Sequence, residues 1–200
     1  MRALDHARIK GALTRLDGTG DTVPPDARRA ALALLLRGET IEDAELLMMR
    51  RAHREGDRWS GQIALPGGHE EESDPSLEHT ARRESREEVG VDPGADDGYC
   101  FGALPPSQAG ARGVRLPLYC VPYVFYRASP PAPDLGPEAS EAFWFPLAPA
   151  MAGDLAATHR YEREGVIHKL PAWEFEGRTV WGMTYSILKR FVDALNTPES

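Results

Sequence analysis

Residues 82–91 read RRESREEVGV, in which three glutamates, Glu84, Glu87 and Glu88, fall within a span of five residues. In an α-helix, residues three and four positions apart share a face, so Glu84 would lie beside both of the others. Carboxylates this close raise one another's pKa and destabilise the helix unless a cation lies among them. Mg²⁺ would remove the conflict, because it prefers hard oxygen ligands and completes its shell with water and phosphate. The stretch therefore predicts either a metal site or a solvated helix face neutralised by neighbouring arginines.

The flanking residues predict a helix over residues 75–89. Asp74 is a natural N-cap, and Pro75 suits the first helical position. Gly90 suits the position after the last helical residue, where the backbone often turns left-handed. Such a helix would be about 22 Å long. Before it, IALPGG (63–68) predicts a short strand that ends in a Gly-Gly turn, where backbone groups can approach a ligand closely.

Outward from this stretch, short apolar runs predict strands and longer amphipathic segments predict helices. We expect strands at residues 31–36, 44–52, 99–104, 116–128 and 141–147, and a late hairpin formed by the segments around 166–173 and 178–183. We expect further helices at residues 3–16, 147–158 and 185–195, and a Pro-rich surface loop at 129–140. The predicted class is α/β or α+β, with helices packed on a mixed sheet. Residues 1–25 are assigned to an N-terminal helix and linker, and residues 26–200 to the main domain.

Composition limits the classes of protein that this chain can be. With 200 residues and 42% hydrophobic content, the chain fits one globular domain. A net charge of −8 argues against general binding to nucleic acid or to a membrane surface. The N-terminus shows no signal-peptide pattern and the longest apolar run, 30–36, is too short to span a bilayer, so a cytoplasmic location is expected. Cys100 and Cys120 are expected to be reduced, buried thiols.

The segment from the Gly-Gly turn to residue 91 resembles the Nudix box, G-x5-E-x7-R-E-U-x-E-E-x-G-U, in which U is apolar. The positions that match are Arg83, Glu84, Glu87, Glu88, Gly90 and Val91. Asp74 stands where the box has its first glutamate, and eight residues instead of seven separate it from Arg83. Ser85 replaces the usual apolar residue. Both departures lie outside the glutamate triplet, so they bear on the loop conformation more than on activity.

The resemblance covers roughly residues 26–195 and implies a Nudix-type α/β/α sandwich with a mixed β-sheet and a catalytic loop-helix. It implies Mg²⁺-dependent cleavage of a nucleoside diphosphate linked to another group, with Mn²⁺ as a substitute. The implied metal ligands are Glu84, Glu87, Glu88 and the carbonyl of Gly67. Any of the three glutamates can instead relay a proton. Arg83 is expected to orient the loop and helix, and the backbone of Gly67 and Gly68 to contact substrate.

Members of the family often add an acidic residue from a later loop as a base or an extra ligand. Glu138 and Glu141 lie near the Pro-rich loop and are the candidates for this role. The alternative for each is a solvated acid that precedes a strand.

A basic segment precedes the Gly-Gly turn and can reach phosphates, including the 3′-phosphate of coenzyme A. Its arginines are Arg50, Arg51, Arg54 and Arg58. The alternative is a solvated surface loop. Trp59 and Trp181 can stack on a base, although buried core aromatics are commoner.

The favoured substrate is coenzyme A or a derivative, because the coenzyme A-hydrolysing branch has a similar one-residue extension with Asp and a similar basic segment. The alternatives are ADP-ribose, NADH, a dinucleoside polyphosphate or a nucleoside triphosphate. A silent nucleotide-binding domain is a further alternative, although all three box glutamates are present. The expected partner is a small nucleotide. The oligomeric state stays open, a homodimer across the N-terminal helix included.

Overall fold

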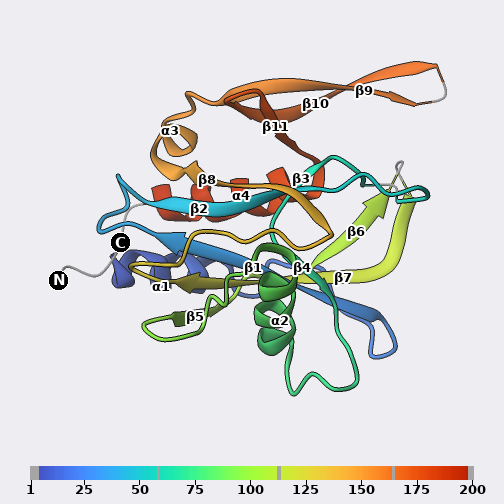
Figure 1. Ribbon diagram of the computed structural model, residues 1–200. Helices are drawn as coiled ribbons and strands as arrows, with labels where there is room; N and C mark the ends of the chain where they lie inside the picture. Colours follow the sequence, from blue (N-terminus) through green and yellow to red (C-terminus); the bar gives the residue numbers. More distant parts are fainter. Residues whose placement is uncertain (1–4, 58, 112–113, 164, 198–200) are drawn as a thin grey trace.

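The structure is a computed structural model that describes residues 5–57, 59–111, 114–163 and 165–197 (Figure 1). The strands of its main sheet are β1 (Arg28–Arg37), β2 (Glu45–Arg51), β3 (Ile63–Ala64), β4 (Gly67–His69), β5 (Tyr99–Ala103), β6 (Ser107–Ala111), β7 (Val114–Tyr126) and β8 (Ala139–Pro146). Their central order is β3-β2-β1-β7-β5, with β4 paired to β1, β6 to β7 and β8 to β2. Strands β1 and β7 run parallel and the other pairs run antiparallel. The predicted mixed sheet is confirmed.

Strand β1 explains why the sheet is covered on both faces. Successive side chains of a strand point to opposite faces, and the run ALALLL is apolar at every position. Ala33 and Leu35 are fully buried in a cluster with Val89 of helix α2 (Leu77–Val89). Leu34 and Leu36 are fully buried in a second cluster on the other face, with helix α4 (Gly182–Asn196). Helices on both faces make the layered α/β/α arrangement.

The N-terminal helix α1 (His6–Leu16) packs on α4 within this second cluster. Ile9 and Ala12 are fully buried. The Arg8 guanidinium donates to the carbonyl of Leu195 at 2.9 Å, and that of Arg15 donates to the carbonyl of Ala194 at 2.9 Å. Carbonyls in the last turn of a helix lack intrahelical donors, so these arginines satisfy the end of α4. The apolar face of α1 is therefore covered by its own chain.

A second sheet consists of β9 (Ala156–Arg163), β10 (Val166–Phe175) and β11 (Arg178–Trp181), in the order β11-β10-β9. It lies above β8 and β3 in the view of Figure 1. The late hairpin was predicted, but the helix predicted over residues 147–158 was wrong beyond its first half. Helix α3 (Leu147–Ala152) ends at Gly153, whose φ of 87° breaks the helix, and the next residues pair with β10.

One strand was not predicted, and one predicted helix cap is wrong. Residues 107–111 form β6, a strand that the sequence SQAGA does not indicate and that exists because β7 pairs with it. The N-cap of α2 is Ser76, whose hydroxyl accepts from the backbone N–H of His79 at 3.2 Å, and not Asp74. The Asp74 carboxylate instead bonds Arg83, across the helix's first two turns. The other end is as predicted, with Gly90 at a φ of 70°.

The remaining departure from the box also has a structural reason. Ser85 is fully buried, and its hydroxyl donates to the backbone carbonyl of Val91 at 2.7 Å. The hydroxyl thus fastens the chain that leaves α2 and is not an unsatisfied polar group in the core. Cys100 and Cys120 are free thiols, as expected, but only Cys120 is buried, whereas Cys100 is half-buried. Within the described ranges, no helix has the length and apolar character needed to span a bilayer.

Candidate active site

Helix α2 holds the three glutamates at different depths against strand β4. The side chain of Glu87 is 57% exposed and that of Glu84 is 15% exposed, whereas Glu88 is 1% exposed. The Oε2 atom of Glu88 accepts a hydrogen bond from the backbone N–H of Gly67 at 2.7 Å. The glutamate face of α2 is therefore pressed onto the Gly-Gly turn.

Negative charge at this face is poorly compensated. Burial and the nearby carboxylates of Glu84 and Glu138 raise the pKa of Glu88 to about 8. The Gly67 amide and the Arg51 guanidinium oppose this shift. Burial also raises the pKa of Glu84. Carboxylates whose pKa is raised by burial and by one another are stabilised when a cation binds among them.

Arg83 joins the glutamate face to the loop that precedes α2. Its Nη1 atom donates to Glu84 at 2.9 Å and to Glu87 at 3.2 Å. Its Nη2 atom donates to the Asp74 carboxylate at 3.0 Å and to the backbone carbonyl of His69 at 2.9 Å. These contacts order the loop and helix and leave no side of the guanidinium directed at a ligand, which agrees with the orienting role expected for it.

The two glycines of β4 are required because neighbouring atoms approach their Cα atoms too closely for a side chain to fit. An added Cβ at Gly68 would lie 2.5 Å from the Glu84 carboxylate. An added Cβ at Gly67, whose φ is 156°, would lie 2.3 Å from the backbone oxygen of Ala31. Both distances are far below van der Waals contact. Only glycine lets the turn lie between β1 and the glutamates.

Glu138 reaches the site because the Pro-rich loop is fastened to the end of α2. The backbone N–H groups of Asp134 and Gly136 donate to the carbonyls of Val89 and Glu88, both at 2.9 Å. These bonds satisfy carbonyls at the C-terminal end of the helix. The side chain of Glu138 lines the same cavity as Glu84, and its charge contributes to the raised pKa of both Glu84 and Glu88.

Glu141, the other predicted acid, is engaged elsewhere. Its carboxylate accepts from the Arg50 guanidinium at 3.0 Å and from the Arg178 guanidinium at 2.7 Å. Hydrogen bonds and charge from Arg178 and then Arg50 lower the pKa of Glu141. The three side chains link β2, β8 and β11, and none of them lines the cavity. Their contacts indicate a structural role.

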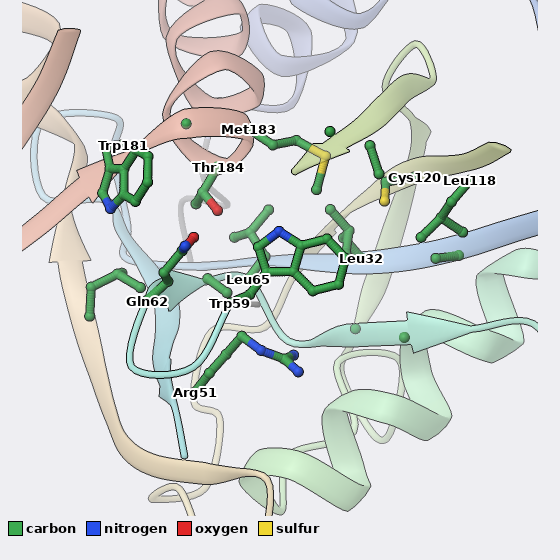
Figure 2. Close-up of a pocket in the computed structure, with 18 of the residues that line it drawn as sticks. Leu32, Arg51, Trp59, Gln62, Leu65, Leu118, Cys120, Trp181, Met183 and Thr184 are labelled. Carbon is green, nitrogen blue, oxygen red and sulfur yellow. The ribbon is translucent and has the colours of Figure 1, made fainter. Parts of the chain in front are cut away.

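A cavity of about 1090 Å³ opens beside the glutamate face, between the main sheet, the second sheet and the start of α4 (Figure 2). Among the predicted arginines, Arg51 lines it and is held by Asp57 at 3.0 Å. Arg54 lies on the surface and pairs with Glu138 at 3.0 Å. Arg50 is bound to Glu141, as described above, and Arg58 lies outside the described residues. Of the three predicted arginines that the structure describes, it therefore brings one, Arg51, to the cavity.

The side chains present fit a hard divalent cation in chemical type and in charge. Mg²⁺ prefers carboxylate and carbonyl oxygens, which Glu84, Glu88 and the backbone of Gly67 offer, and a cation among them would favour the ionised form of Glu88, whose pKa is raised to about 8. In the present arrangement, no three His, Cys, Asp or Glu side chains of the described residues are grouped closely enough to hold a metal ion. The contacts given above account for this, because Arg83 engages Glu84 and Glu87 while the Gly67 amide engages Glu88.

The cavity also contains two polar residues that the sequence motifs did not indicate, Gln62 before β3 and Thr184 in α4. Gln62, Trp181 and Thr184 line the cavity together with Trp59. Trp59 and Gln62 precede β3, whereas Trp181 and Thr184 lie more than 100 residues later, so no local pattern could group the two pairs. Trp59 and Trp181, the two candidates for base stacking, both lie at the cavity and not in the core.

Comparisons with known proteins agree with this site. A NUDIX domain model matches residues 26–169. An uncharacterized Nudix hydrolase, NudL, of Salmonella paratyphi B is 32% identical over 190 residues, which cover 93% of this chain and 91% of the relative. An uncharacterized protein of Schizosaccharomyces pombe is 33% identical over 147 residues, which cover 63% of this chain and 44% of that longer protein. Among solved structures, a MutT protein of Methanosarcina mazei superposes with a TM-score of 0.50 at 19% identity, covering 84% of this chain and 92% of its own.

The structural match shows the same fold, and the family model and NudL carry the assignment. Together with the glutamates, the Gly-Gly turn and the left-handed Gly90 at their required spacing, they show that this chain belongs to the Nudix family of hydrolases, which act on phosphoanhydride bonds.

Proposed function

We propose that this protein is a Mg²⁺-dependent pyrophosphohydrolase that cleaves a nucleoside diphosphate linked to a second group, with coenzyme A or a derivative as the favoured substrate. The observation that supports this most is Glu88, a buried carboxylate that lies beside Glu84 and Glu138 with its pKa raised to about 8. A carboxylate in such surroundings costs stability unless the site binds a cation. All three glutamates of the box are present, which disfavours a silent domain.

Glu84, Glu87, Glu88 and the carbonyl of Gly67 would hold Mg²⁺, or Mn²⁺ in its place. When bound, the ion would neutralise phosphate oxygens and make a water molecule nucleophilic. Arg83 keeps the loop and helix in register for these ligands through its bonds to Asp74 and His69.

Other residues of the chain would act on the substrate directly. The Arg51 guanidinium lines the cavity and can bind a phosphate oxygen, and Asp57 restricts its orientation. The Glu138 carboxylate lines the same cavity and can take a proton from the attacking water at one of its oxygens. Its pair with Arg54 is exposed on both sides, so the carboxylate can leave it at little cost.

The size of the cavity supports a substrate with a long second group. A volume of about 1090 Å³ is slightly above the usual range of ligand pockets, about 300–1,000 Å³. The basic segment supports coenzyme A less than the sequence suggested, because only Arg51 of its described arginines lines the cavity. ADP-ribose, NADH, dinucleoside polyphosphates and nucleoside triphosphates therefore remain alternatives to be compared directly.

Product analysis by mass spectrometry tests this proposal. The purified protein would be incubated with Mg²⁺ and each of these compounds separately. We expect coenzyme A to be converted to adenosine 3′,5′-bisphosphate and phosphopantetheine faster than the others are cleaved. Preference for another compound would overturn the coenzyme A assignment and leave the hydrolase assignment. No Mg²⁺-dependent cleavage of any compound would overturn both.

Paired variants separate the two candidate acids. Glu138→Gln should lower kcat by about 10²-fold, the size typical of losing a general base, and leave stability unchanged. Glu141→Gln should leave kcat unchanged and lower the free energy of unfolding by about 1 kcal/mol, because Arg50 and Arg178 lose a charged acceptor. Steady-state kinetics and urea denaturation of both variants measure this. An equal loss of kcat in the two variants would contradict the assignment.

A further inference from the structure

The cavity is not uniform along its length. In Figure 2, Trp181, Gln62 and Thr184 lie on one side of Trp59, and Leu118 and Cys120 lie on the other. The first side presents a large aromatic ring and polar groups, and the second presents apolar side chains. In the proposed function, the glutamate face and Arg51 bind only the diphosphate part of the substrate. Each side of the cavity can therefore take a different part of the substrate.

Trp181 is a rigid platform. It is the last residue of β11, where it pairs with Ala172 of β10. The His159 ring stacks on the indole, with 4.2 Å between ring centroids and 25° between ring planes. The Tyr161 ring lies 5.5 Å away at 36°. These rings, both from β9, fix the indole before any ligand arrives, so stacking on it costs little side-chain entropy.

The polar groups beside Trp181 are unengaged. The Gln62 side-chain amide and the Thr184 hydroxyl both line the cavity and are half-buried. Neither makes a hydrogen bond to another described residue, and the same holds for the indole N–H groups of Trp59 and Trp181. Because no fully buried polar side-chain atom of the described residues lacks a partner, these groups are open to the cavity and free to bind a ligand. An amide that carries both donors and an acceptor, next to an aromatic face, has the chemistry that recognises the edge and the plane of a heterocycle.

We infer that this side of the cavity is the nucleobase subsite: the base stacks on Trp181, and Gln62 and Thr184 hydrogen-bond its edge. The inference rests on the proposed function, because it assumes a nucleotide substrate whose diphosphate lies at the glutamates. It assigns to the second sheet, which carries Trp181 and its two supporting rings, the platform on which the base stacks, and to Gln62 and Thr184 the selection among bases. The apolar side, with Leu118 and Cys120, is left for the group beyond the diphosphate.

Calorimetric titration with adenosine 5′-monophosphate and ribose 5-phosphate tests the subsite without turnover, because neither compound contains a phosphoanhydride. The wild-type protein should bind the nucleotide more tightly than the sugar phosphate. Trp181→Leu should weaken nucleotide binding by about tenfold and leave ribose 5-phosphate binding unchanged. Trp144→Leu is the matched control, since Trp144 packs under Arg37 at 4.0 Å and does not line the cavity. It should bind both compounds as the wild type does, and circular dichroism would verify the fold of each variant.

A second variant tests the polar edge. Gln62→Leu keeps the volume of the side chain and removes its hydrogen-bonding groups. It should bring the affinities for adenosine and uridine 5′-monophosphates closer together, whereas Trp181→Leu should weaken both. Equal binding of the nucleotide and the sugar phosphate by the wild type, or unchanged nucleotide binding by Trp181→Leu, would overturn the subsite. An unchanged base preference in Gln62→Leu would overturn the role of its amide. Mg²⁺-dependent turnover depends on the glutamates and is measured separately, so the two proposals can fail independently.

Discussion

Glu88→Gln should lower kcat of the Mg²⁺-dependent cleavage by about 10³-fold, because it removes a charged oxygen ligand and with it several kcal/mol of transition-state stabilisation. The substitution keeps the size of the side chain, and its amide oxygen can still accept from the Gly67 N–H, as Glu88 does at 2.7 Å. Steady-state kinetics with the best substrate found by product analysis would measure the effect. Glu78→Gln, in the first turn of the same helix, is the matched control and should turn over as the wild type does.

Although Glu88→Gln should lower activity, it should raise the stability of the metal-free protein at high pH. The pKa of Glu88 is raised from 4.5 to about 8 in the folded state. A raised folded-state pKa contributes stability that is fully present below the unfolded pKa and is lost as pH rises through the folded pKa. Gln cannot ionise, so Glu88→Gln should match the wild type near pH 4.5 and unfold at a higher temperature near pH 8. Thermal unfolding in a chelator at both pH values measures this.

These two measurements decide the role of Glu88 together. Low activity of Glu88→Gln together with raised stability at high pH would identify Glu88 as a carboxylate that binds a cation and does not stabilise the fold. Wild-type turnover in Glu88→Gln would contradict the metal-binding role. Low activity with lower stability at both pH values would show that the side chain is structural.

What the sequence predicts well is local. The segment 82–91 carries its own helix signal, and Gly90 at the expected left-handed position follows from the steric demands of a helix end. The Gly-Gly turn is equally readable, since only glycine tolerates the approach of Glu84 to Gly68. These features depend on a few neighbouring residues. The Nudix box is also a short local pattern, so the family resemblance predicts the same features.

What the sequence does not predict depends on partners far along the chain. Residues 156–158 read as the end of a helix, and they begin strand β9 because β10 pairs with them. Glu138 and Glu141 look alike in sequence, and only the arginine pair from β2 and β11 separates their roles. The polar side of the cavity combines Gln62 with residues of β11 and α4, so its composition becomes visible only in the folded chain.

Asp74→Asn should lower the free energy of unfolding at pH 7 by about 3 kcal/mol, the usual result of breaking a buried ion pair by removing one partner. The Asp74 side chain is 1% exposed, and Arg83 reaches it with Nε at 3.1 Å and Nη2 at 3.0 Å. The Thr80 hydroxyl donates to the same carboxylate at 2.9 Å. The substitution leaves the Arg83 charge, 13% exposed, without its main partner. Urea denaturation would measure the loss, with Glu72→Gln as an exposed control in the same loop.

The pH dependence of this loss separates an ion pair from simple packing. Hydrogen bonds from Arg83 hold the pKa of Asp74 well below its ordinary value of 3.8. A depressed pKa contributes stability that is present above the unfolded pKa and is lost as pH falls through the folded pKa. The difference in free energy of unfolding between wild type and Asp74→Asn should therefore be largest at neutral pH and shrink below about pH 4.

The same substitution should also affect activity. Since Arg83 also positions Glu84 and Glu87, kcat of the folded variant should fall about tenfold, far less than for Glu88→Gln. A difference in free energy of unfolding that did not change with pH would mean that Asp74 contributes through packing and not through its charge. An unchanged kcat would mean that Arg83 positions the glutamates without Asp74.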